Sequence, residues 1–211
     1  MKLLPQDSLV KTGPVDEAAW VYRPFLGQIA RLRFRMIVRL LGNAGYGRLL
    51  EIGYGSGILL PELGEHCEEL YGIDPHAMPD TVSHALGRHG VRAVLKTAAA
   101  EAIPFTDHFF DAVVAVSALE FVTDLEKVCR EIKRILNPEG RFFFVTPGTS
   151  RALDFGLKLL TGNDAKKDFG NRRELVLPVT TRHFAFEKTL TAPPLLGAFA
   201  PLYRAVRCKV R

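Results

Sequence analysis

Three glycines at alternate positions form the strongest chemical signal in the chain. Gly53, Gly55 and Gly57 follow a short apolar run at 48–52 and precede a helical pattern. Glycine has no Cβ, so the backbone can turn sharply here and approach a ligand closely. The helix that follows would offer free N–H groups to polar or anionic ligand atoms. Because isoleucine stands at 58, the loop departs from the G-x-G-x-x-G pattern of dinucleotide sites, and the loop alone does not identify the ligand.

A carboxylate follows the next apolar run. Asp74 ends the segment 69–73, roughly 20 residues after the glycines, and this is the spacing at which an acid binds ribose hydroxyls in nucleotide-binding folds. An alternative is that Asp74 only caps a helix or forms a turn ahead of Pro75. The glycine loop and the spacing together favour ribose binding.

Two residues are candidates for proton transfer. Glu120 follows the apolar run 110–117, at the edge where sheets of this kind bind ligands. It could act as a base or bind substrate, or it could be a solvated carboxylate at a helix start. His183, in the weakly patterned tail, is a second candidate base. Tyr54 either packs over the ligand or is an exposed loop aromatic, and no His, Asp or Glu spacing suggests a metal site.

These residues must be positioned by alternating strands and helices. We expect strands at 48–52, 69–73, 91–96, 110–117 and 141–146, and helices at 56–66, 78–87 and 125–136. Such alternation predicts a parallel sheet with helices on both faces. The β-like stretches 186–191 and 203–210 predict an antiparallel C-terminal hairpin. The expected fold class is therefore α/β, with a Rossmann-like, mostly parallel seven-stranded sheet. Residues 154–160 could form a further helix, and 174–178 is a short apolar stretch without an assigned element.

The length of 211 residues fits one domain. Residues 1–24 are irregular, and the apolar spacing over 25–41 predicts an amphipathic helix. We expect 1–45 to form a helical cap that belongs to the same domain as the core at 46–211.

The segment E-x-G-x-G-x-G at 51–57, followed by the acid at 74, resembles the class I S-adenosylmethionine (AdoMet) methyltransferases, especially the small-molecule and quinone methyltransferases. The resemblance covers about 47–146. It implies that AdoMet is the cofactor and S-adenosyl-L-homocysteine the product, with the methionine part in the glycine loop and the ribose on Asp74. The candidate cofactor-binding residues are Glu51, Gly53, Tyr54, Gly55, Gly57, Asp74, Pro75, Ala100, Glu101 and Ser117.

The chain departs from this family in two places. The family often has an acid near position 99, whereas this chain has alanine at 98–100, which leaves adenine to main-chain groups and Ile103. Glu120 stands where a histidine is common. These departures keep a second hypothesis open, in which the chain is a non-catalytic partner subunit with the same fold.

The tail predicts the character of the methyl acceptor. It is rich in Leu, Phe and Pro over 193–202, which favours an apolar pocket and a small apolar or aromatic acceptor. The alternative is that these side chains merely close the core. Nucleic acid is not an expected partner, because no [D/N/S]-P-P-[Y/F] segment follows 110–117, and an RNA methyltransferase is the weakest hypothesis.

Charge and hydropathy limit the remaining possibilities. The net charge is +5, with basic residues concentrated at the two ends. An arginine stripe at 31, 35 and 39 could meet an anionic membrane surface or an acidic substrate, or could simply be solvated. Neither a long apolar run nor a leader pattern is present, so we expect a cytoplasmic protein. The three separated cysteines predict neither a disulfide framework nor a zinc site.

Overall fold

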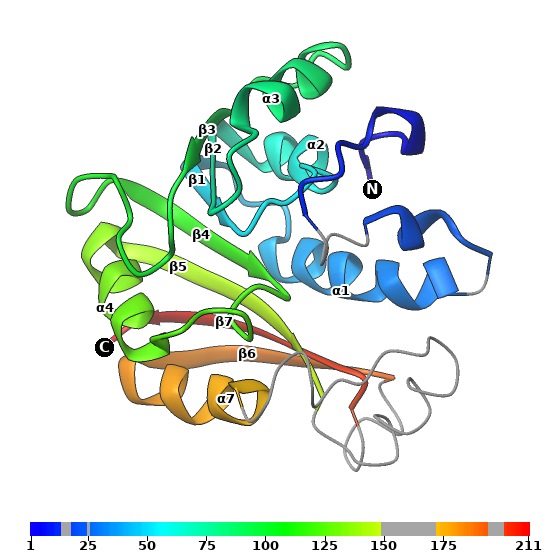
Figure 1. Ribbon diagram of the computed structural model, residues 1–211. Coiled ribbons are helices and arrows are strands. Elements are labelled where there is room, and N and C mark those ends of the chain that lie inside the picture. Colours follow the sequence, from blue (N-terminus) through cyan, green and yellow to red (C-terminus); the bar gives the residue numbers. More distant parts are fainter. Residues whose placement is uncertain (14–17, 25, 149–171, 194–200) are drawn as a thin grey trace.

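The computed structural model describes residues 1–13, 18–24, 26–148, 172–193 and 201–211. Its centre is a seven-stranded sheet with the order β3-β2-β1-β4-β5-β7-β6 (Figure 1). The strands are β1 (Tyr46–Ile52), β2 (Cys67–Asp74), β3 (Val94–Thr97), β4 (Phe110–Val116), β5 (Leu136–Pro147), β6 (Phe184–Ala192) and β7 (Tyr203–Val210). The first five pair in parallel, whereas β7 pairs antiparallel with both β5 and β6. The predicted fold class and the C-terminal hairpin are confirmed.

The helices cover both faces of this sheet (Figure 1). They are α1 (Leu26–Leu41), α2 (Leu60–Leu63), α3 (Pro79–Gly87), α4 (Leu125–Ile135) and α7 (Arg172–His183), with short 3₁₀ turns at Gln6–Ser8, Ala18–Tyr22 and Gly64–His66. Side chains of α1, α2 and α3 share one apolar core, and those of α4 and α7 share another. Among the described residues, no helix is long and apolar enough to cross a membrane.

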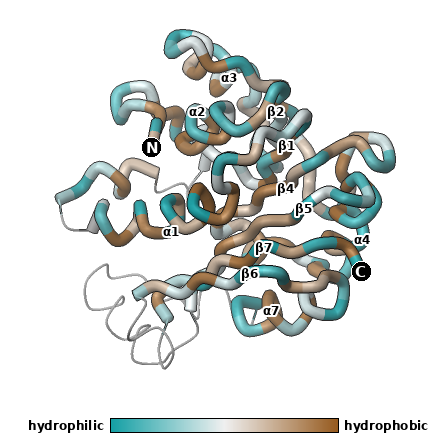
Figure 2. The backbone as a smooth tube through the Cα atoms, turned by 180° about the vertical axis from the view of Figure 1, so that it is seen from behind, coloured by the Kyte–Doolittle hydropathy of each residue, from teal (hydrophilic) through white to brown (hydrophobic). Residues whose placement is uncertain are grey.

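β4 shows why the sheet needs cover on both sides. Ala112 and Val114 belong to the core under α1, whereas Val113 and Ala115 belong to the core under α4, and all four are fully buried. Successive side chains of a strand point to opposite faces, so an apolar run such as this one must lie between two layers of helices. The brown colouring of the central strands in Figure 2 follows from the same composition.

Several predicted boundaries are wrong for local reasons. The helix expected at 56–66 begins only at Leu60, because Gly57 has a φ of +75°, which an α-helix does not allow. The third strand begins at Val94 rather than 91, since the Val91 N–H is bonded to the Leu86 carbonyl at the end of α3. The fourth strand ends at Val116, because Ser117 adopts a φ of +52°.

Helix α7 was not predicted. It contains Pro178, which usually interrupts a helix, and its polar residues do not mark one face. Val176 and Val179 nevertheless pack in the core beneath α4, so tertiary contacts stabilise the helix. The possible helix at 154–160 lies outside the described residues.

The N-terminal segment packs onto the sheet domain. Leu4 is fully buried, and its N–H donates to the Ile58 carbonyl at 3.0 Å, just after the glycine loop. α1 contacts β4, β5 and β7. The division into a cap at 1–45 and a core at 46–211 stays a prediction.

Candidate cofactor and active site

The glycine loop has the conformation that its sequence predicts. Gly53, Gly55 and Gly57 have φ angles of +77°, +51° and +75°, in the region that favours glycine. A Cβ on Gly53 would lie 2.7 Å from the Ala118 Cβ, and one on Gly57 would lie 2.9 Å from the Val82 Cγ1. At Gly55 an added Cβ would meet no atom within 4 Å. Two glycines are therefore required by packing, and the middle one faces open space.

Asp74 lies directly beside this loop. Its Oδ2 accepts the Gly55 N–H at 2.9 Å, and its Oδ1 accepts the His76 N–H at 3.1 Å. The two positions meet because β1 and β2 are adjacent parallel strands, with Ile52 in register with Ile73. A carboxylate oxygen can accept more than one hydrogen bond, so both oxygens keep capacity for ligand hydroxyls. The structure thus brings together the two parts of the predicted nucleoside site.

Two aromatic rings line the same corner. Tyr54 is only 3% exposed, so it is not an exposed loop aromatic. A Cβ on Gly72 would lie 2.8 Å from the Tyr54 Cδ1, which shows how closely the ring covers β2. Its ring packs edge-on against His76 at 4.9 Å, and the His76 Nε2 lies 3.0 Å from the Gly55 carbonyl. Burial, followed by the nearby Asp74 charge, raises the pKa of Tyr54.

Unpartnered polar atoms gather at the carboxyl ends of β1, β4 and β5. The buried atoms without a hydrogen-bond partner among the described residues include Glu51 Oε2, Tyr54 Oη, Ser56 Oγ, Ser117 Oγ, Glu120 Oε2 and Thr146 Oγ1. Leaving one such group unpaired costs about 1–3 kcal/mol. A cluster of them is therefore expected where a ligand supplies the partners.

Glu51 and Glu120 are the two buried carboxyl groups of this cluster. Burial raises the pKa of Glu51 to about 8, and the Asp74 charge adds to the effect. Burial raises the pKa of Glu120 to about 7, opposed by its own N–H and by Arg33 and Arg173. Glu120 is 1% exposed, so it is not a solvated carboxylate. Its proton can be gained or lost near neutral pH.

The segment after β3, residues 98–103, forms one wall of the candidate site. Ala100 and Ile103 are 8% and 3% exposed and pack in the same core as Ile73 and Leu119. Glu101 has a contact that the sequence did not indicate, because its Oε1 accepts the N–H groups of Thr123 at 2.8 Å and Asp124 at 3.3 Å. Its carboxylate thereby ties this wall to the loop that follows Glu120.

His183 lies elsewhere. It ends α7, and its Nε2 contacts the Glu126 carboxylate. β6 starts at the next residue and runs in the same direction as β5, so His183 is at the opposite end of the sheet from the glycine loop. The structure does not bring His183 together with Glu120.

Comparison with known families supports a cofactor site at this position. The model of the methyltransferase domain family matches residues 50–144, from the middle of β1 to the end of β5. Residues 50–144 thus match the methyltransferase domain family, and they lie within a sheet of the Rossmann-like methyltransferase fold.

Curated relatives of this chain match only in part. An uncharacterized methyltransferase of Bacillus subtilis is 32% identical over 100 residues, covering 46% of this chain and 40% of the relative. A ubiquinone biosynthesis O-methyltransferase of Pseudomonas fluorescens is 34% identical over 127 residues, covering 57% of this chain and 53% of the relative. The chain thus spans about half, or less, of the length of these relatives.

Solved structures share the fold over nearly the whole chain. The N-methyltransferase NodS of Bradyrhizobium japonicum, crystallised with S-adenosyl-L-homocysteine, aligns with a TM-score of 0.64. The alignment covers 95% of this chain and 94% of NodS at 17% identity. At this identity the likeness shows the fold alone.

The residues of the candidate site fit AdoMet. Gly55 leaves open space beside Asp74, and hydroxyl and carboxyl groups without partners among the described residues face the same end of the sheet. A nucleoside with two ribose hydroxyls and an amino-acid end needs such a set of donors and acceptors. The individual roles of Glu51, Pro75, Ala100, Glu101 and Ser117 in binding stay predictions.

Sequence reasoning missed three polar residues of this cluster. Ser56 and Thr146 are 2% exposed and have no partner for their hydroxyls in the described part of the chain. Arg33 lies on α1, with its guanidinium 4.9 Å from the Phe34 ring centre, and it lowers the pKa of both Glu51 and Glu120. Ser56 could have been found inside the glycine loop. Thr146 could have been found at the end of the predicted strand 141–146, whereas Arg33 could not, because only the packing of α1 over the sheet brings it to the site.

Proposed function

We propose that this protein transfers the methyl group of AdoMet to a small apolar or aromatic acceptor. The observation that carries the proposal is the meeting of Gly55 and Asp74 beside open space, next to the unpartnered polar atoms of Glu51, Ser117 and Glu120. The burial of Glu120, which raises its pKa to about 7, supports a role in proton transfer rather than in binding alone.

AdoMet, when bound, supplies a methyl group that is already activated on its sulfonium. The protein therefore contributes mainly position and the exclusion of water. Asp74 accepts hydrogen bonds from ribose hydroxyls, and the carboxyl group of Glu51 lies where the amino-acid end of the cofactor can be bound. Glu120 Oε2 accepts a proton from an acceptor that must lose one.

The neighbourhood of Glu120 supports an apolar acceptor. Phe121 follows it and is 42% exposed, and Leu119 and Val122 lie on either side. Relatives named for lipid-soluble compounds include a phosphatidylethanolamine N-methyltransferase of Cereibacter sphaeroides and a sterol 4-C-methyltransferase of Caenorhabditis elegans. One name specifies methylation of nitrogen and the other methylation of carbon. The two relatives therefore support an apolar acceptor but do not indicate which of its atoms is methylated.

Calorimetry with AdoMet and S-adenosyl-L-homocysteine tests cofactor binding. We expect wild-type binding and a loss of at least about tenfold in affinity for Asp74→Ala, since hydrogen bonds to a charged group contribute about 1.5–3 kcal/mol. Gly55→Val should weaken binding similarly, because it fills the open space and strains a φ of +51°. Glu139→Ala, an exposed carboxylate at the start of β5, is the control and should bind as wild type does.

Two outcomes contradict the proposal. Absence of wild-type binding at millimolar AdoMet would favour the partner-subunit hypothesis, and salt-sensitive RNA binding would favour a nucleic-acid role. The acceptor class is tested with methyl-labelled AdoMet and cell extract, where label in the organic phase is expected and label only in RNA would refute it.

A further inference from the structure

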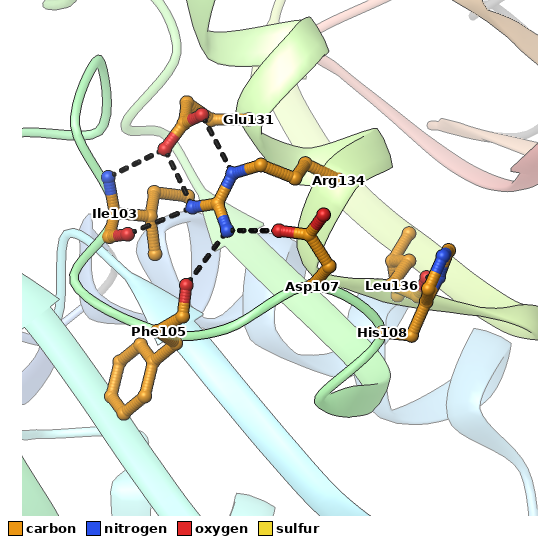
Figure 3. Close-up of polar contacts among 7 residues, drawn as sticks. All are labelled: Ile103, Phe105, Asp107, His108, Glu131, Arg134 and Leu136. Atoms are coloured by element: carbon orange, nitrogen blue, oxygen red, sulfur yellow. Dashed lines mark hydrogen bonds and ion pairs between the residues drawn. The ribbon is translucent and has the colours of Figure 1, made fainter.

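Arg134 holds the segment 103–107 with three of its N–H groups and binds Glu131 with the other two (Figure 3). Its Nε and Nη2 donate to the two carboxylate oxygens of Glu131, each at 2.9 Å. Nη2 also donates to the Ile103 carbonyl at 2.9 Å, and Nη1 donates to the Phe105 carbonyl and to Asp107 Oδ1, each at 2.8 Å. A guanidinium has five N–H donors, so every one of them is used here.

Glu131 completes the hold on Ile103. Its Oε2 accepts the Ile103 N–H at 2.9 Å, so side chains of α4 bind both main-chain polar groups of that residue. Both groups of the pair are charged at neutral pH, since the hydrogen bonds to Arg134 lower the pKa of Glu131. α4 itself is anchored by the Asp124 N-cap and by the fully buried Val128 and Ile132.

The chain that leads into this held segment, residues 98–102, starts beside the nucleoside site. The Ala98 N–H donates to the Asp74 carbonyl at 3.0 Å, and the chain then passes through Ala100 to Ile103. Alanine fills 98–100, so no side chain there can hydrogen-bond a base. Recognition of the base is thereby left to main-chain groups, whose directions must be fixed by something else.

We propose that Arg134 and Glu131 are positioning residues that fix the main chain of 98–103 as the base-recognising wall of the AdoMet site. The inference rests on the proposed function, since it assumes that the nucleoside of AdoMet lies against this wall. Neither residue is among the candidate cofactor-binding residues. They act through the main-chain groups of Ile103 and Phe105.

The test compares two ligands that differ only at the base. S-Adenosyl-L-homocysteine carries an amino group at position 6 of the purine, and S-inosyl-L-homocysteine carries an oxygen there. Wild type should prefer the adenosyl compound. Arg134→Lys keeps the charge but has three donors in place of five, so we expect the affinity for the adenosyl compound to fall by about tenfold, and the preference to fall with it.

Arg141→Lys is the matched control. Arg141 also binds a carboxylate, that of Glu187 at 2.9 Å, and main-chain carbonyls, but it does so at the start of β5, away from Asp74. Both lysine variants should lower the melting temperature. Only Arg134→Lys should change the ratio of the two affinities, which a merely structural role would leave unchanged.

The outcomes distinguish a failure of the proposed function from a failure of the inference about Arg134 and Glu131. If wild type binds neither ligand, the proposed function fails and this inference fails with it. If wild type binds both ligands equally, or if Arg134→Lys keeps the wild-type ratio, the inference is wrong and the proposed function stands. Should Arg134→Lys not fold, Glu131→Gln takes its place. It removes one of two oxygens that accept three N–H groups, and the same loss of preference is expected.

Discussion

Single residues of the glycine loop serve different purposes although they share one residue type. Gly53 and Gly57 leave no room for a Cβ, because Ala118 and Val82 are already in contact distance. Gly55 has room for one and is constrained only by its φ of +51° and by what binds beside it. Two carboxyl groups of the site, those of Asp74 and Glu120, also differ in their surroundings. Asp74 is hydrogen-bonded in the loop, whereas one oxygen of the buried Glu120 has no hydrogen-bond partner in the part of the chain that the structure describes.

Glu120→Gln should stabilise the protein at alkaline pH and reduce its activity. Folding raises the pKa of Glu120 from 4.5 to about 7, so between these values the folded protein holds a proton that the unfolded chain has lost. The free energy of unfolding of wild type therefore falls as pH rises through this window. The gain of the variant over wild type should grow from pH 5 to pH 8 by on the order of 3 kcal/mol.

Urea unfolding at both pH values measures this difference. Glu139→Gln, at an exposed site, is the control, and its free energy of unfolding relative to wild type should not change between the two pH values. The rate of methyl transfer by wild type should rise with pH through about 7, and that rise should be absent in the variant. A gain that is equal at pH 5 and pH 8 would show that Glu120 is not buried as described.

Side-chain hydrogen bonds connect loops to helices at places where the sheet itself makes no connection. The segment after β3 is tied to α4 by Arg134 and to the loop before α4 by Glu101. The arginine stripe on α1 is also partly engaged. The Arg31 Nε donates to the Val21 carbonyl at 3.0 Å, and Arg35 binds Gln28. Arg31 thus holds the N-terminal segment, and the stripe is not a purely solvated face.

Glu101→Ala should loosen the loop after β4 without unfolding the protein. The variant leaves the Thr123 and Asp124 N–H groups without their carboxylate acceptor, and an unsatisfied group of this kind costs about 1–3 kcal/mol unless water replaces the partner. Hydrogen exchange followed by mass spectrometry should show faster exchange at 121–124 and little change in the helix at 79–87. Unchanged protection at 121–124 would contradict this account of Glu101.

The whole molecule brings its N-terminus back to the glycine loop. The Leu4 N–H is bonded to Ile58, and the Tyr22 hydroxyl donates to the Leu4 carbonyl. The main-chain N–H of Lys2 and the charged N-terminus meet Glu62 on α2. The first residues of the chain thus pack against the elements that follow the ligand loop.

Leu4→Ala should destabilise the whole protein. A fully buried leucine that is shortened to alanine costs about 2–5 kcal/mol through lost contacts and the cavity left behind. Leu9→Ala, at a half-buried position, should cost clearly less. Urea denaturation measures both. Equal costs for the two would indicate that the N-terminal segment is not packed as described.

The sequence by itself determined the sheet, its cover of helices and a nucleoside-binding pattern, and its resemblance to a known family indicated the cofactor. Alternating apolar runs, the glycines at 53, 55 and 57, and the acid at 74 are local patterns whose physical demands do not depend on distant residues. Tertiary structure decided the rest. Helix α7 forms around Pro178 because its valines are buried, and Arg33 comes within electrostatic reach of Glu51 and Glu120 only when α1 packs over the sheet. Burial and long-range contacts decide where these side chains lie and whether they are charged, and residue spacing alone does not predict either.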